Sequence, residues 1–258
     1  MRAYDLDMTL PPTRYFYGQD KLNYADLHRP TGDGAGTGAA RGTVVLVHGG
    51  FWRWSPDYFD GPTPLARAFA AEGFAVWQLE YRTVGAGGGW PTTFVDVDAG
   101  IAHLAVVAED EGIELGHVVT VGHSAGGHLA VWALGVENSP LVGAVSLAGV
   151  LDLRLAEREN LGRGAVANFL GGSSARHPER IDSASPTEHP IVGKAVRLVH
   201  GDADPTVPDS QSRSYLAAAL AAGQDAALSG FPGDHFDVID PTHDSWKLTL
   251  AAVVELAA

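Results

Sequence analysis

Cysteine is absent from this chain of 258 residues, which excludes disulfides, thiolate metal ligands and a cysteine nucleophile. Lysine is scarce: Lys21, Lys194 and Lys247 are the only three among 17 basic residues, against 31 acidic ones. The formal net charge is -14. This balance argues against a nucleic-acid partner, because phosphate-backbone binding needs clustered Lys and Arg. It also leaves no polybasic patch for a membrane surface.

Long hydrophobic runs are missing as well. The longest weakly polar run, at 141–151, is far shorter than the ~18 to 20 residues of a membrane span. Residues 1–7 read Met-Arg-Ala-Tyr-Asp-Leu-Asp and lack the apolar centre of a signal peptide. We therefore expect a cytoplasmic protein without a membrane partner. A homodimer is compatible with the sequence.

The composition that remains, 45% apolar and 19% charged, is typical of a globular protein, and 258 residues fit one domain (1–258). Short apolar runs alternate with helical patterns. Near-continuous apolar runs suit parallel strands that are buried on both faces. The pattern predicts an α/β fold with a mostly parallel central sheet and helices on both faces. Strands are expected at 43–47, 74–81, 118–121, 144–148, 195–199 and 226–231, with a less clear one at 22–28, and helices at about 63–72, 92–111, 125–136, 210–222 and 243–257.

Two segments interrupt this alternation. Residues 34–39 (Gly-Ala-Gly-Thr-Gly-Ala) match a dinucleotide fingerprint by letter, but they lead into a strand instead of following one and opening a helix. We interpret 31–42 as a flexible surface loop and expect no cofactor. Residues 150–190 are too long for a simple connection and hold a helical stretch near 164–170. This segment is predicted to be a small cap or lid over the site.

The chemistry centres on Gly122-His123-Ser124-Ala125-Gly126, a G-x-S-x-G motif between a strand and a helix. The glycines allow a sharp turn that exposes the Ser124 hydroxyl. The Ala125 N–H then faces a reacting carbonyl, and the helix dipole favours a developing anion there. The motif predicts Ser124 as a nucleophile. His123 is expected beside it in the substrate pocket.

A second motif, His48-Gly49-Gly50-Phe51-Trp52, follows the first clear strand. It resembles the H-G-G-G oxyanion loop, with Phe51 at the third glycine. The N–H groups of Gly50 and Phe51 are predicted to complete an oxyanion hole with Ala125. His48 is expected to support the loop. Trp52 is expected to line the pocket, and Trp54 either lines it or packs the loop.

A nucleophilic serine needs a base, and the base needs an orienting acid; in G-x-S-x-G enzymes both follow the serine in the chain. Asp204 is preferred as the acid over Asp202, which lies nearer its strand and is expected to stabilise the turn. His235 is preferred as the base over His243, which is expected at the start of the last helix.

No metal is expected, because the chain has no H-E-x-x-H motif. His123 and His128 flank Ser124 at an H-x4-H spacing, but this is no zinc signature and a third ligand is missing.

With these motifs the sequence resembles the α/β-hydrolases, in particular the H-G-G-x-W branch of kynurenine formamidases (arylformamidases) and related bacterial carboxylesterases. The matching segments are 48–52, 81–82, 87–91, 122–126, 200–208 and 233–235. The resemblance implies a triad of Ser124, Asp204 and His235 that works without a cofactor.

The expected activity is hydrolysis of a small ester or amide through an acyl-enzyme, with N-formylkynurenine as the favoured substrate. A general carboxylesterase or peptidase-like hydrolase is the alternative, and a non-catalytic binding protein with this fold is a third hypothesis. The rings of Phe51 and Trp52 are expected to crowd the acyl side of the oxyanion hole. Formyl and acetyl substrates should therefore have a higher kcat/KM than octanoyl esters. If the rings point away, that size limit does not apply.

Overall fold

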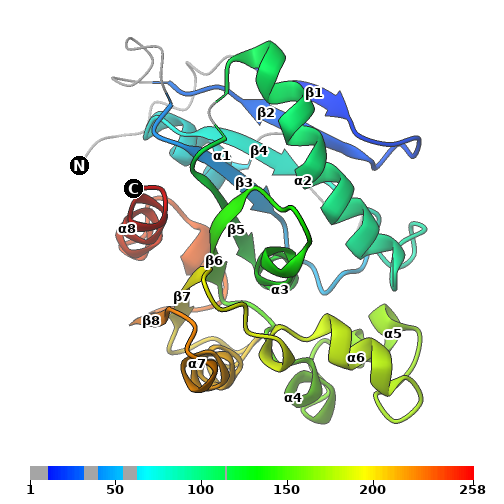
Figure 1. Cartoon of the computed structure of the whole chain (residues 1–258). Coiled ribbons are helices and arrows are strands. Elements are labelled where there is room, and N and C mark those ends of the chain that lie inside the picture. The colour runs from blue at the N-terminus through cyan, green and yellow to red at the C-terminus, as the bar shows by residue number, and fades with distance from the viewer. Residues whose placement is uncertain (1–10, 32–39, 55–62, 114) are drawn as a thin grey trace.

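The computed structural model describes residues 11–31, 40–54, 63–113 and 115–258. Within these residues the chain forms one eight-stranded sheet in the order β1-β2-β4-β3-β5-β6-β7-β8 (Figure 1). The strands are β1 (Thr13–Phe16), β2 (Tyr24–His28), β3 (Thr43–Val47), β4 (Ala75–Leu79), β5 (Val118–His123), β6 (Leu141–Leu147), β7 (Ala195–Gly201) and β8 (Ala226–Phe231).

The six strands from β3 to β8 are mutually parallel, and β1 and β2 join the β4 edge in antiparallel pairing. Strand β3 lies between β4 and β5, so Val47 pairs with Leu79 on one side and Gly122 on the other. The predicted fold class is confirmed. Strand β1 was not predicted: it has four residues, and its side chains alternate between half-buried and exposed, so it lacks the apolar run of the central strands.

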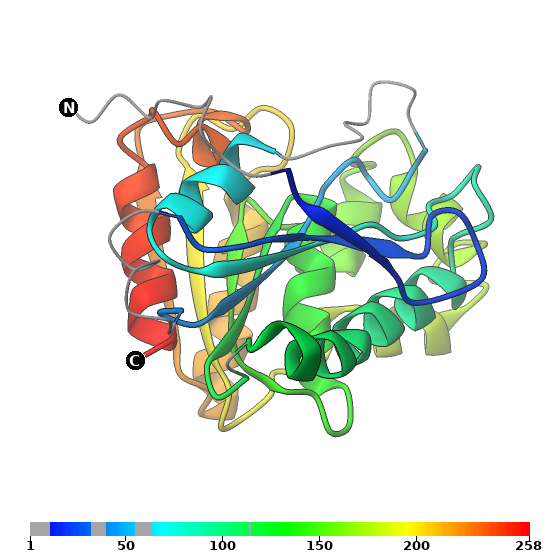
Figure 2. The same ribbon diagram turned by 90° about the horizontal axis from the view of Figure 1, so that it is seen from above.

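Helices cover both faces of the sheet. The main ones are α1 (Pro64–Ala71), α2 (Thr92–Glu111), α3 (Ala125–Trp132), α7 (Ser210–Ala222) and α8 (Trp246–Leu256). Helices α1 and α8 pack on one face, where the Phe69 ring contacts those of Phe74 and Trp246. Figure 2 shows these two helices (cyan and red) together on the side opposite α2 and α3. No described helix is both long and apolar enough to cross a membrane.

The long segment 150–190 contains three short helices, α4 (Leu153–Arg158), α5 (Ala165–Leu170) and α6 (Pro178–Ala184), and it lies beside α3 (Figure 1). The sequence predicted only the second of these. Their inner side chains, among them Leu153, Phe169 and Ile181, join the larger of the two cores. The other unusual segment, the glycine-rich stretch with the rejected dinucleotide match at 34–39, lies outside the described residues.

The parallel arrangement fixes the place of the candidate site. Strands β3, β5, β7 and β8 all point the same way, so the loops after their carboxyl ends meet at one edge of the sheet. These loops carry the four sequence segments that begin at His48, Ser124, Asp202 and Gly233. Residues more than 180 positions apart in the chain thereby come together.

Candidate active site

Ser124 stands at a sharp turn between β5 and α3. Its backbone has φ 56° and ψ −121°, a conformation that residues with a β-carbon rarely adopt. The turn is tight: a β-carbon at Gly122 would lie 2.1 Å from the Gly126 carbonyl oxygen, and one at Gly126 would lie 2.2 Å from that of Val47. Only glycine fits at both positions. The turn therefore has the geometry that G-x-S-x-G predicts, and Ser124 lines a cavity at the sheet edge.

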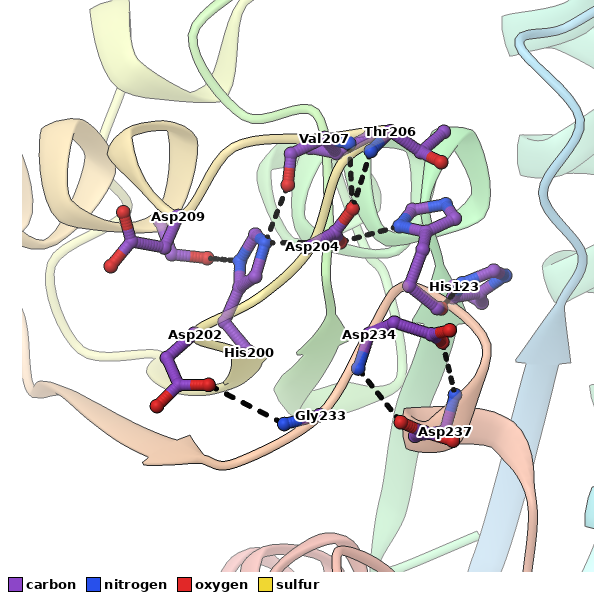
Figure 3. Close-up of polar contacts among 12 residues, drawn as sticks. His123, His200, Asp202, Asp204, Thr206, Val207, Asp209, Gly233, Asp234 and Asp237 are labelled. Carbon is purple, nitrogen blue, oxygen red and sulfur yellow. Dashed lines mark hydrogen bonds and ion pairs between the residues drawn. The ribbon is translucent and has the colours of Figure 1, made fainter.

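Asp204 and His235 form the pair that the sequence places behind the serine. The Nδ1 of His235 lies 2.6 Å from Asp204 Oδ2, and the Asp204 side chain is fully buried. The other carboxylate oxygen accepts the backbone N–H groups of Thr206 at 2.8 Å and Val207 at 2.9 Å (Figure 3). Since Nδ1 donates to the carboxylate, Nε2 of His235 is left as the proton acceptor.

A second histidine contacts the same carboxylate from the opposite side (Figure 3). Nε2 of His200 donates to the Val207 carbonyl at 2.8 Å and lies 3.4 Å from Asp204 Oδ2, while Nδ1 contacts the Ser212 hydroxyl at 2.7 Å. Burial by itself would raise the pKa of Asp204. The hydrogen bonds from His200, His235 and the Val207 N–H outweigh it, so the pKa lies well below its usual range. Asp204 stays ionised beside His235.

His123 also lines the cavity, as the sequence predicted. Its Nε2 lies 2.8 Å from the His235 carbonyl oxygen, and the two rings lie 4.5 Å apart. Because a carbonyl oxygen only accepts, Nε2 of His123 carries the proton. Burial, followed by the proximity of His235, lowers the pKa of His123 to about 3, which keeps this ring neutral beside the candidate base.

The loop after β3 brings Gly50 and Phe51 to the same cavity as Ser124. Among the described residues, no hydrogen bond uses the N–H of Gly50, Phe51 or Ala125 as its donor, which leaves all three for a ligand. Phe51 has φ 51° and Trp52 has φ 55°, so two consecutive non-glycine residues are left-handed. The loop is held in an unusual conformation.

His48 supports this loop, as expected, and also lines the cavity. Its ring stacks on Tyr81 at 4.3 Å, and Nε2 lies 3.0 Å from Glu80 Oε1. The Tyr81 hydroxyl donates to the His48 carbonyl at 2.8 Å. Burial disfavours the charged ring, but the adjacent Glu80 carboxylate more than compensates, so the pKa of His48 is raised.

Trp52 does not line the cavity, contrary to expectation. Its side chain is fully buried and turned into the core, where the indole stacks on Phe169 at 4.6 Å and donates to His128 Nδ1 at 3.1 Å. The Trp52 backbone is left-handed, with φ 55°. Trp54 does line the cavity and is 56% exposed.

The cavity has a volume of about 840 Å³ and is lined mainly by apolar side chains. Several of the described lining residues lie outside the sequence motifs and were not predicted. They include Leu46, Leu65, Gln78, Leu79, Glu80, Phe236 and Ile239. The apolar strand patterns predict that Leu46 and Leu79 are buried. They do not show that the carboxyl ends of these strands face a cavity. None of the described lining residues belongs to 150–190, so this segment lies beside the oxyanion loop instead of over the cavity.

The two alternative residues occupy other positions. Asp202 is exposed, and its side chain accepts the Gly233 N–H, in the loop after β8, at 3.4 Å. His243 contacts Ser245 at 3.0 Å and packs near Phe231. Within the described residues, no group of three or more His, Asp or Glu side chains is arranged to hold a metal ion.

The comparisons with known proteins identify the family and the fold of this chain. Residues 26–220, well over half of the chain, match the BD-FAE family. The chain belongs to this α/β-hydrolase esterase family, which confirms the resemblance to the superfamily. The esterase LipQ of Mycobacterium tuberculosis is 31% identical over 150 residues, which cover 52% of this chain and 35% of LipQ. The match thus spans about a third of that relative.

Solved structures show the same fold. A truncated carbohydrate esterase from gut microbiota superimposes with a TM-score of 0.81 at 21% identity, over 97% of this chain and 98% of that one. Esterase B of Lactobacillus rhamnosis gives a TM-score of 0.78 at 22% identity, over 96% and 86%. Esterase 2 of Thermogutta terrifontis, phosphonylated by sarin, gives 0.70 at 24% identity, over 95% and 92%. The α/β-hydrolase fold is thereby established.

Proposed function

We propose that this protein is a serine carboxylesterase that hydrolyses esters through an acyl-enzyme formed on Ser124. The observation that carries the proposal is the 2.6 Å contact between His235 Nδ1 and the buried Asp204, with Ser124 and His235 lining one cavity. This contact orients His235 so that Nε2 can take a proton from the serine. Membership in an esterase family and the likeness to LipQ support the same chemistry.

The reaction proceeds in two halves. Ser124 Oγ attacks the ester carbonyl while its proton passes to His235 Nε2, and Asp204 stabilises the imidazolium. The N–H groups of Gly50, Phe51 and Ala125 stabilise the oxyanion, and loss of one such donor costs ~3 kcal/mol. His235 then protonates the departing alcohol as the tetrahedral intermediate collapses. Water, deprotonated by His235, attacks the acyl-enzyme and releases the carboxylic acid and Ser124.

Kynurenine formamidase activity is the second candidate function, because N-formylkynurenine is the substrate that the sequence favours. Phe51 at the cavity wall supports a small acyl group. Trp52 does not support a small acyl group, because its ring lies in the core and not at the cavity wall. A cavity of about 840 Å³ accommodates acyl groups larger than formyl. These observations give a formamide no size-based advantage over an ester. The cytoplasmic location and the homodimer remain predictions from the sequence.

The deciding experiment compares kcat/KM for 4-nitrophenyl acetate, butanoate and octanoate with that for N-formylkynurenine. We expect kcat/KM of the best ester to exceed that of the formamide by about tenfold or more. The reverse order would favour the formamidase. Absence of turnover, together with no labelling of Ser124 by a fluorophosphonate, would refute both and leave a binding protein.

A further inference from the structure

His128 is a fully buried histidine outside the proposed triad, and both of its ring nitrogens have partners. Nδ1 lies 3.1 Å from the indole nitrogen of Trp52, and Nε2 lies 2.8 Å from the Ala184 carbonyl oxygen. An indole N–H only donates and a carbonyl only accepts. These two partners therefore require a neutral His128 ring that carries its proton on Nε2. Burial agrees, since it lowers the pKa of His128 to about 4.

The three residues in this chain of hydrogen bonds come from three different parts of the site. Trp52 belongs to the oxyanion loop, directly after Gly50 and Phe51. His128 lies in α3, one turn after Ser124, whose carbonyl accepts the His128 N–H at 3.2 Å. Ala184 ends α6 in the segment 150–190. His128 therefore links the oxyanion loop to the helix that carries the nucleophile and to the segment beside it.

The oxyanion loop needs such a link because its backbone is unfavourable. Phe51 and Trp52 are both left-handed, which residues with a β-carbon avoid. Backbone hydrogen bonds connect the loop to Val84: the Val84 N–H donates to the Trp52 carbonyl at 2.7 Å, and the Trp54 N–H donates to that of Val84 at 2.9 Å. A third, from the Arg53 N–H to the Gly50 carbonyl at 3.0 Å, lies within the loop. The Trp52 indole restrains it from the core, between His128 and the stacked ring of Phe169.

We propose that Trp52 and His128 are positioning residues for the oxyanion hole: the indole–imidazole hydrogen bond holds the loop so that Gly50 and Phe51 direct their N–H groups toward the carbonyl on Ser124. This inference rests on the proposed esterase function. It assigns a common purpose to the tryptophan of His48–Trp52 and to the histidine that follows the G-x-S-x-G motif. Neither residue touches the substrate.

The test uses variants that remove or keep the hydrogen bond between Trp52 and His128 while they change the packing of the core as little as possible. Trp52→Phe keeps a ring on Phe169 and removes the N–H donor. His128→Phe removes the acceptor, whereas His128→Asn can place its amide oxygen near the former Nδ1 and accept from Trp52. Tyr215→Phe is the matched control, because it removes another buried hydrogen bond, from Tyr215 to Gln224 at 2.8 Å, far from the loop.

The readout is kcat per Ser124 titrated with a fluorophosphonate, together with KM and Tm. We expect kcat per labelled site to fall about tenfold or more in Trp52→Phe and His128→Phe with KM nearly unchanged, because a small displacement of an oxyanion donor slows the chemical step. His128→Asn should recover most of kcat. Tyr215→Phe should lower Tm and leave kcat per site unchanged.

The outcomes separate the two proposals. If the wild type is labelled and active but Trp52→Phe keeps its kcat per site, the positioning role is wrong while the esterase function stands. Equal losses in His128→Asn and His128→Phe would also overturn it, since the acceptor would then be irrelevant. A wild type that is neither labelled nor active refutes both proposals. Should His128→Phe fail to fold, Trp52→Phe and His128→Asn still decide the question.

Discussion

Asp204 and Asp202 are two residues apart, yet only Asp204 contacts His235, at 2.6 Å from a fully buried side chain. Asp202 points to solvent and lies 3.4 Å from the Gly233 N–H. The turn after β7 therefore carries a buried candidate acid and, two residues earlier, an exposed carboxylate whose side chain contacts the loop after β8. This difference in contacts gives the first prediction.

Asp204→Asn should lower kcat about 10⁴-fold, because an amide stabilises the wrong tautomer of His235 and carries no charge to oppose the imidazolium. Asp202→Asn is the matched control, since it makes the same chemical change two residues away on an exposed side chain. It should leave kcat nearly unchanged. Steady-state kinetics with a 4-nitrophenyl ester would measure both variants, and a larger loss in Asp202→Asn would disprove the assignment of the acid.

Ser124→Ala should abolish turnover, with a loss of about 10³-fold or more, and remain folded. Alanine keeps the β-carbon and therefore the same backbone cost at φ 56°, so Tm should change little. Initial rates, thermal melting and fluorophosphonate labelling together separate lost chemistry from lost structure. Persistent turnover in a folded variant would mean that another group is the nucleophile.

Stability should fall as the pH drops below about 6.5, the usual pKa of histidine, because burial lowers the pKa of His128 to about 4. Between these values the unfolded chain binds a proton at this ring and the folded chain does not, so protonation favours unfolding. The stabilising contribution is complete above pH 6.5 and is lost toward pH 4. His28 and His123 act in the same direction, with lowered pKa values of about 4 and 3.

The His128 contribution is measured by urea unfolding of the wild type and His128→Asn at about pH 7.5 and about pH 5. The wild type should lose about 2 kcal/mol more than the variant between these conditions. A difference between the two proteins that is independent of pH would show that His128 is not held neutral in the folded state.

Chelation should leave activity unchanged. The carboxylate of Asp204 already accepts hydrogen bonds from His235, Thr206 and Val207, so its oxygens are used by protein donors. Dialysis against EDTA followed by an esterase assay checks this expectation, with untreated enzyme as the control. A loss of activity that zinc or manganese restores would contradict the proposed mechanism.

The sequence by itself determined most of the helices and strands and singled out a candidate nucleophile. Strand 43–47 agrees with β3 to the residue, and helix 92–111 agrees with α2, because apolar runs and their periodicity are local properties. The Ser124 motif was recognisable from five consecutive residues, although one of its glycines is required by a contact outside the turn: a β-carbon at Gly126 would lie 2.2 Å from the Val47 carbonyl oxygen in β3. Chain order after the serine left Asp202 and His243 as alternatives, and their expected places, in the turn after a strand and at the start of the last helix, made Asp204 and His235 the preferred candidates.

Only the tertiary structure decided where the side chains beyond these motifs point. Trp52 follows the oxyanion motif directly and reads as a pocket residue, yet its left-handed backbone turns the indole toward His128. Segment 150–190 reads as a lid, yet it packs against α3 and the loop, since Phe169 finds its partner ring in Trp52. Such outcomes depend on contacts between residues more than 70 positions apart, which no local pattern encodes.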